Sequence, residues 1–204
     1  MEKNVRKRTK TLVELAMLSA IILLLTLTPL GYLPIGPLEV TTMMIPVAIG
    51  AMTMGTGAGL FLGGVFGVSS FLTCLGILRV SSFGQMLFSI SPLGAAAVCI
   101  VPRLLMGALC GLLFRILNRK KKNRTWVFAV CSAFSALCNT VFFMGGLAFI
   151  FRPLLLSMAA EEGKPLFVFI LSISLFNCLG EIAASILVGT PIAKAVCRYR
   201  SRKA

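Results

Sequence analysis

The side chains that could do chemistry are the few polar ones inside the long apolar stretches of this chain. Glu181 lies in the last such stretch, and Asn177 precedes it by four residues. On a helix this spacing places both side chains on one face. Asn139 and Thr140 lie together in the middle of the preceding stretch. Polar groups at such positions are costly in lipid, so they predict a site that binds a ligand or couples transport.

Arginines supply the complementary charge. Arg103 lies inside an apolar stretch, and a structural ion pair between Arg103 and Glu181 is the alternative to a functional role for either. A hydrogen bond between helices is the corresponding alternative for Asn139. Arg79 and Arg152 fall in segments that we expect outside the membrane, where either one could hold the carboxylate of a ligand.

Several classes of membrane enzyme are excluded by what the sequence lacks. The chain has no His and no Asp, and its six acidic residues are all Glu. Intramembrane metalloproteases need His ligands, rhomboid-type proteases need a His base, and metal-dependent alcohol phosphotransferases need clustered Asp. We therefore expect neither an enzyme nor a metal site. The seven cysteines form no CxxC pair and are expected to be reduced, buried packing residues.

Composition indicates an integral membrane protein, because 58% of the residues are hydrophobic and only 13% are charged. A net charge of +14 would suggest nucleic acid in another context. Here the basic residues flank apolar stretches instead of forming a stripe with interleaved aromatics, so we expect no nucleic-acid partner. The first apolar stretch runs into a Pro/Gly loop without a small-residue cleavage site, which favours a membrane helix over a signal peptide.

The basic residues fix a membrane topology. Sixteen of the twenty Lys and Arg residues lie in three clusters, at positions 3–10, 115–124 and 194–203. Basic residues in short loops stay on the cytoplasmic side, so both termini are expected in the cytoplasm and the crossings between clusters must be even in number.

Apolar stretches of about 20 residues then predict a six-helix transmembrane bundle in a single membrane domain, residues 1–204. The predicted helices cover residues 11–29, 38–54, 55–76, 92–117, 126–151 and 165–196. The external segments follow as residues 30–37, 77–91 and 152–164. The segment 77–91 is unusually apolar for an external loop, which indicates that it folds over another part of the protein.

Small residues mark two helix faces. Gly55, Gly59, Gly63 and Gly67 repeat every four residues, and such GxxxG units let helix backbones approach closely inside a bundle. Ala16 and Ala20 form a second small-xxx-small pair in the first predicted helix. If that pair lies on an outer face, it predicts a partner helix.

The chain resembles the substrate-binding S components of energy-coupling factor (ECF) vitamin transporters over essentially its whole length. The resemblance is carried by the six-helix length, the basic inside segments, the Ala16-xxx-Ala20 pair and two sequence runs. These runs are TPLGYLPIGPLEVTTMMIPVAIG, residues 28–50, and VPRLLMG, residues 101–107.

The resemblance implies a multi-pass protein of the prokaryotic cytoplasmic membrane that takes up a small water-soluble vitamin. Ala16 and Ala20 would contact a transmembrane coupling subunit, which is carried by two cytoplasmic ATPases. ATP would be used by those partners, and this chain would bind no cofactor; it has no GxxxxGK[ST] phosphate loop. The substrate site implied by position draws on residues of the last two helices and of the external loops, namely Tyr32, Arg79, Asn139, Asn177 and Glu181.

The substrate can be narrowed from the aromatic residues. Flat aromatic vitamins favour stacking on Trp or Tyr, but Trp126 is expected on the cytoplasmic side and Tyr32 is the one external Tyr. A small vitamin without a large ring system is therefore favoured. The run 28–50 is most similar to S components for pantothenate or for hydroxymethylpyrimidine and pyridoxine precursors, and pantothenate is the preferred expectation. The alternatives are a stand-alone secondary transporter or channel coupled through Glu181, and a membrane assembly factor.

Overall fold

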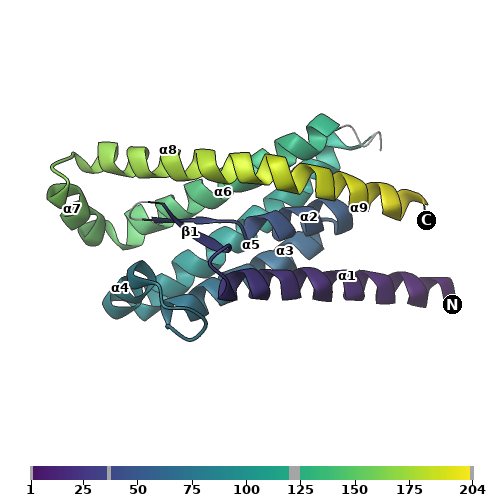
Figure 1. Cartoon of the computed structure of the whole chain (residues 1–204), viewed down its shortest axis with the longest axis horizontal. Helices are drawn as coiled ribbons and strands as arrows, with labels where there is room; N and C mark the ends of the chain where they lie inside the picture. Colours follow the sequence, from purple (N-terminus) through teal and green to yellow (C-terminus); the bar gives the residue numbers. More distant parts are fainter. Residues whose placement is uncertain (1, 36–37, 120–124, 203–204) are drawn as a thin grey trace.

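The computed structural model describes the backbone of residues 2–35, 38–119 and 125–202, and the side chains within residues 9–31, 41–119 and 125–200. Helices dominate this part of the chain (Figure 1). The elements in chain order are α1 (Glu2–Leu27), β1 (Tyr32–Ile35), β2 (Leu38–Thr41), α2 (Met44–Met54), α3 (Thr56–Cys74), α4 (Ser82–Ile90), α5 (Pro92–Leu117), α6 (Thr125–Ile150), α7 (Arg152–Glu161), α8 (Leu166–Ala184), the π-helical turn η1 (Ser185–Gly189) and α9 (Thr190–Arg202).

Five helical segments of the described chain are long and apolar enough to cross a membrane. They comprise residues 9–27, 56–74, 92–117, 125–150 and 166–200, the last of which joins α8, η1 and α9. The remaining predicted helix, residues 38–54, corresponds to α2, which has only 11 residues and spans about half of the hydrocarbon thickness. Because α2 is buried from Met44 to Met52, it is a core helix of the bundle.

The predicted helix over residues 38–54 is wrong at its start. Leu38–Thr41 instead pairs with Tyr32–Ile35 as an antiparallel hairpin, and Tyr32 is the register partner of Thr41. The β-branched pair Val40 and Thr41 favours a strand over a helix, which explains the difference.

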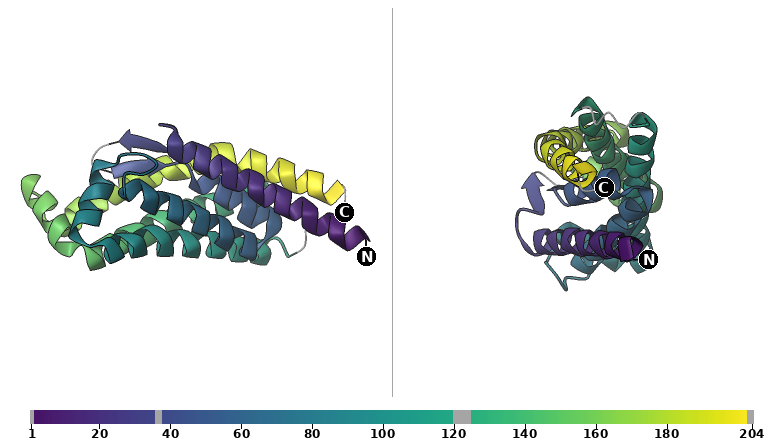
Figure 2. Two further views of the ribbon diagram at one scale, coloured as in Figure 1. Left: turned by 90° about the horizontal axis from the view of Figure 1, so that it is seen from below. Right: turned by 90° about the vertical axis from the view of Figure 1, so that its right-hand side faces the viewer.

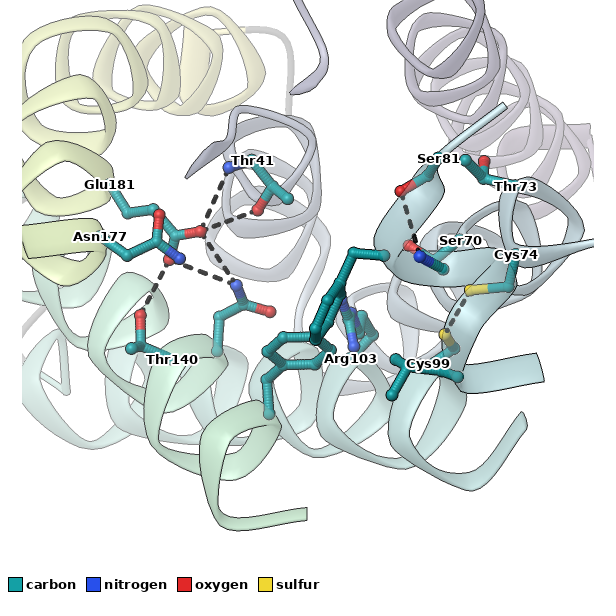
Figure 3. Close-up of a pocket in the computed structure, with 15 residues that line it drawn as sticks. Thr41, Ser70, Thr73, Cys74, Ser81, Cys99, Arg103, Thr140, Asn177 and Glu181 are labelled. Carbon is teal, nitrogen blue, oxygen red and sulfur yellow. Dashed lines mark hydrogen bonds between the residues drawn. The ribbon is translucent and has the colours of Figure 1, made fainter. Parts of the chain in front are cut away.

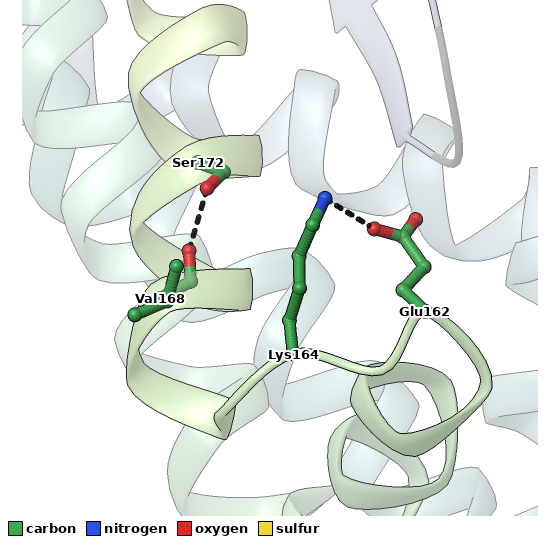
Figure 4. A network of polar contacts seen from close by, with 4 residues as sticks. All are labelled: Glu162, Lys164, Val168 and Ser172. Atoms are coloured by element: carbon green, nitrogen blue, oxygen red, sulfur yellow. Dashed lines mark hydrogen bonds and ion pairs between the residues drawn. The ribbon is translucent and has the colours of Figure 1, made fainter.

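Two predicted external loops also contain helices. Ser81 caps α4 by accepting a hydrogen bond from the backbone N–H of Gly84 at 3.3 Å, and Pro153 stands in the first turn of α7. The turn between α7 and α8 is held by an ion pair of 2.8 Å between Lys164 Nζ and Glu162 Oε2 (Figure 4). Both of those side chains are exposed, so this pair shapes the turn and adds little stability.

Helices α3 and α5 pack backbone against backbone. A Cβ atom placed on Gly59 would lie 2.2 Å from the carbonyl oxygen of Gly107, and one on Gly107 would lie 2.1 Å from that of Gly59. Gly63 meets the carbonyl of Arg103 in the same way, at 2.2 Å. The prediction that the glycine face packs inside the bundle is therefore confirmed for Gly59, Gly63 and Gly67, whereas Gly55 precedes α3 and an added Cβ atom there would meet no other atom within 4 Å.

The two ends of the bundle differ in character. Figure 1 shows the two termini together at one end, and β1, α4 and α7 at the opposite end. Figure 2 shows α1 and α9 running side by side toward the ends of the chain. At that end an ion pair of 2.9 Å joins Glu14 of α1 to Arg200 of α9. Elements that could cover a ligand therefore gather at the end away from both termini.

Candidate functional site

A pocket lies among β2, α3, α4, α5, α6 and α8, toward the end of the bundle that carries α4 (Figures 1 and 3). Its interior holds about 70 Å³ of free space, and one side of it is open. The lining combines apolar side chains with many polar ones, which are Thr41, Ser70, Thr73, Cys74, Ser81, Cys99, Arg103, Asn139, Thr140, Asn177 and Glu181.

One wall of the pocket is organised by the carboxylate of Glu181, which is only 1% exposed. Its Oε1 accepts hydrogen bonds from the backbone N–H of Thr41 at 3.3 Å, from Thr41 Oγ1 at 2.9 Å and from Asn139 Nδ2 at 3.3 Å. Its Oε2 accepts from Asn139 Nδ2 at 3.2 Å and from Thr140 Oγ1 at 3.0 Å. The carboxylate thus ties the end of the β-hairpin to α6 and α8.

Hydrogen-bonding capacity remains on this wall for a ligand. Both oxygens of Glu181 are fully used, since Oε1 accepts three bonds and Oε2 accepts two. The side-chain oxygens of Asn139 and Asn177 are buried without a hydrogen-bond partner in the described part of the chain. Buried polar atoms are nearly always paired in proteins, so two unpaired amide oxygens in a pocket indicate contacts with a hydroxyl or amide N–H of a ligand.

The positive charge of Arg103 lies on a different wall (Figure 3). This side chain is 4% exposed, and its Nη1 donates to the carbonyl of Val98 at 2.7 Å. The guanidinium carbon lies 5.3 Å from the ring centre of Phe66 and 4.5 Å from that of Phe143. Its Nε has no partner among the described residues, and no carboxylate there lies within ion-pair distance of it.

The structural ion pair between Arg103 and Glu181, considered from the sequence, is therefore not formed. The two side chains come from different helices and face separate walls, and Glu181 is satisfied by neutral donors instead. A buried cation without a counter-ion is unfavourable. An anionic group of a ligand beside Arg103 would supply the missing charge.

The predicted site residues divide into two sets. Asn139, Asn177 and Glu181 converge on the pocket. Arg79 does not line it and lies half-buried in the bend after α3. The backbone of Tyr32 pairs with Thr41 at the edge of the site, but its side chain lies outside the described residues.

Arg103 and Thr41 also belong to the site, although neither was predicted as a binding residue. Arg103 is recognisable in the sequence as a charge inside the membrane, with an ion pair to Glu181 as the structural alternative. Thr41 carried no sequence signal, because its role depends on a strand that was predicted to be helical. The described residues contain no group of three or more His, Cys, Asp or Glu side chains that could hold a metal ion.

The outer face of α1 carries the predicted partner pair. Ala16 and Ala20 are both exposed, as are Val13, Met17 and Leu24 around them. An outward face with two small residues offers a close approach to another helix.

Two comparisons with known proteins find similarity over nearly the whole chain. The family model described as "ECF transporter, substrate-specific component" matches residues 10–193. The chain is also similar to a protein named Pantothenate transporter PanT from Leuconostoc mesenteroides subsp. mesenteroides. The two are 29% identical over 202 residues, which cover 96% of each chain.

Proposed function

The chain belongs to the family of substrate-specific components of ECF transporters, and we propose that it binds pantothenate in the pocket between Arg103 and Glu181. The observation that carries this proposal is the buried guanidinium of Arg103, which has no counter-ion among the described residues and lies opposite a wall of neutral acceptors and one fixed carboxylate. The similarity to a pantothenate transporter over nearly the whole chain supports it.

The chemistry of pantothenate fits this arrangement group by group. Its carboxylate is assigned to Arg103, where a bidentate, charge-assisted contact is available. Its hydroxyl and amide groups are assigned to the unpaired oxygens of Asn139 and Asn177. Its two methyl groups are assigned to the apolar part of the lining, which includes Phe83 and Leu87.

This chain supplies binding, and we assign the energy of transport to its partners. In this proposal the exposed Ala16 and Ala20 pair of α1 contacts a transmembrane coupling subunit, and two cytoplasmic ATPases use the ATP. The protein then works in the cytoplasmic membrane of a prokaryote. A stand-alone transporter coupled through Glu181 is disfavoured, because four donor groups of the protein already hold that carboxylate in place.

The binding test uses the purified chain alone. Mass spectrometry identifies any small molecule that co-elutes with it, and calorimetric titration compares pantothenate with pantothenol, in which a neutral alcohol replaces the carboxylate. We expect pantothenate to bind at micromolar or tighter affinity and pantothenol about 100-fold more weakly. Absence of pantothenate binding in this range would refute the proposal.

The partner face is tested in membranes that contain the coupling subunit and the ATPases. The variant with Ala16→Trp and Ala20→Trp should bind pantothenate normally but lose uptake, because the bulky side chains prevent close helix contact. Leu171→Trp is the matched control, since Leu171 is exposed on the outer face of α8. Uptake that survives the double substitution would place the docking face elsewhere.

A further inference from the structure

Two cysteines face each other in the wall of the pocket. Cys74 is the last residue of α3, and Cys99 lies in the second turn of α5. Their sulfur atoms are 3.6 Å apart and share a hydrogen bond (Figure 3). Both residues are buried from the surface, at 7% and 3% exposure, but both line the cavity. The prediction of reduced, buried cysteines is confirmed for both residues, and their position beside the cavity adds to it.

We propose that Cys74 and Cys99 are an oxidisable thiol pair whose disulfide restrains α4 over the pocket and slows the exchange of substrate. This inference rests on the proposed function for its second part only. A disulfide has an S–S distance of about 2.05 Å, so the two sulfurs need to approach by only about 1.5 Å.

The chemical setting favours reaction at this pair. Reactive cysteines occur in electropositive surroundings that small molecules can reach, and Arg103 contributes its charge one helical turn after Cys99. The reactant is a hydroperoxide such as hydrogen peroxide. One sulfur attacks a peroxide oxygen, so that the S–O bond forms, the O–O bond breaks and one water leaves. The second thiol then attacks the resulting sulfenic sulfur, the S–S bond forms and a second water leaves, so two thiols are oxidised and one peroxide is reduced.

The structure connects this disulfide to the cover of the pocket. The loop that leads to α4 begins directly after Cys74, and Ser81, Phe83, Gly84 and Leu87 of this region line the pocket. The first turn of α4 rests on Cys74, since a Cβ atom on Gly84 would lie 3.0 Å from its sulfur. A bond from Cys74 to α5 would fix the point from which α4 moves, and the exchange of ligand depends on such movement.

Tryptic peptides can detect the disulfide without ambiguity. Cleavage after Arg79 and Arg103 places the two cysteines in separate peptides, residues 11–79 and 80–103, and neither peptide contains another cysteine. The purified chain is treated with hydrogen peroxide, its remaining thiols are blocked, and the digest is analysed by mass spectrometry. We expect a cross-linked pair of these two peptides that dithiothreitol separates. Absence of the cross-link would overturn the proposal.

The effect on substrate is measured as the dissociation rate of radiolabelled pantothenate. We expect exchange about tenfold slower after peroxide treatment, with recovery after dithiothreitol. In the Cys99→Ser variant, peroxide should leave the dissociation rate of pantothenate as it is in the same variant without peroxide. In the control variant Cys197→Ser, whose substitution lies in α9, peroxide should still slow dissociation. A cross-linked protein that exchanges pantothenate as fast as the reduced one would overturn the restraint. If the reduced protein binds no pantothenate, the proposed function fails, and the peptide cross-link still decides whether the thiol pair is oxidisable.

Discussion

Replacement of Arg103 by Met gives opposite expectations for ligand binding and for protein stability. Among the described residues the guanidinium of Arg103 has one hydrogen bond, to the carbonyl of Val98, and contacts with two aromatic rings. Those contacts contribute roughly 2–4 kcal/mol together. They are offset by the cost of burying a cation without a counter-ion, which is of the same size. Because Met has a similar length and no charge, Arg103→Met should leave the free protein as stable as before or slightly more stable.

In contrast, Arg103→Met should weaken the complex with pantothenate. A carboxylate about 3.5 Å from the guanidinium gains roughly 5 kcal/mol of Coulomb energy at an effective dielectric constant of about 20. Part of this gain is lost to desolvation, and truncating one partner of such a buried pair typically costs 2–5 kcal/mol. A loss of about 3 kcal/mol corresponds to an affinity roughly 150-fold weaker.

Calorimetry and thermal unfolding in detergent measure the two effects separately. Pantothenol serves as a second ligand, because Arg103→Met should strongly weaken the binding of pantothenate and leave the binding of pantothenol almost unchanged. Arg152→Met is the matched control, since Arg152 is exposed on α7 outside the pocket and its loss should leave the affinity unchanged.

Two results would refute the reasoning about Arg103. An affinity within threefold of the original would mean that no anionic group of the ligand contacts it. A large loss of thermal stability in the free variant would mean that Arg103 is held for the bundle and not for a ligand.

Two further predictions concern the framework of the site. Gly59→Ala should destabilise the protein by about 2–3 kcal/mol in thermal unfolding, because its Cβ atom would lie 2.2 Å from a backbone oxygen of α5. Gly57→Ala is its control and should be neutral, since no atom lies within 4 Å of the added carbon, and equal effects would contradict the close packing of α3 and α5. Glu181→Gln should weaken the binding of pantothenate about tenfold, because the hydrogen bonds from Thr41 and Thr140 that shape this wall are weaker to a neutral amide than to a carboxylate. Thr41→Val should also weaken the binding of pantothenate, and the double variant should lose less affinity than the sum of the two single losses, because the two side chains share a hydrogen bond. Unchanged affinity in both single variants would limit Glu181 to a role in stability.

Helix positions followed from the sequence where length and end signals coincided. The predicted helix over residues 92–117 agrees with α5 at both ends. Its start is marked by Ser91, which caps the first turn, and by Pro92, which begins the helix. Short elements had no such length signal. The apolar segment 77–91 does fold over another part of the protein, since four of its residues line the pocket, but its nine-residue helix α4 is too short to give a length signal.

The candidate site was predictable to the extent that lipid makes polar groups conspicuous. Asn139, Asn177 and Glu181 could be selected because each is polar within an apolar helix. Which partners these side chains face depends on helix rotation and on packing between distant segments. For that reason the pair of Arg103 and Glu181 was considered but is absent, while the bond from Thr41 to Glu181 had not been considered.

The distribution of charge in the pocket bears on which vitamin it can accept. The negative charge of Glu181 is held by hydrogen bonds from the protein, so a cationic ligand gains little there and would also meet the positive charge of Arg103. A neutral ligand would leave the guanidinium buried without a counter-ion, at a continuing cost in free energy. An anionic ligand removes that cost on binding, so the free energy saved adds to its affinity. In the proposed site, preference for an anionic vitamin follows from one arginine that has no counter-ion among the described residues, while the fold already satisfies Glu181.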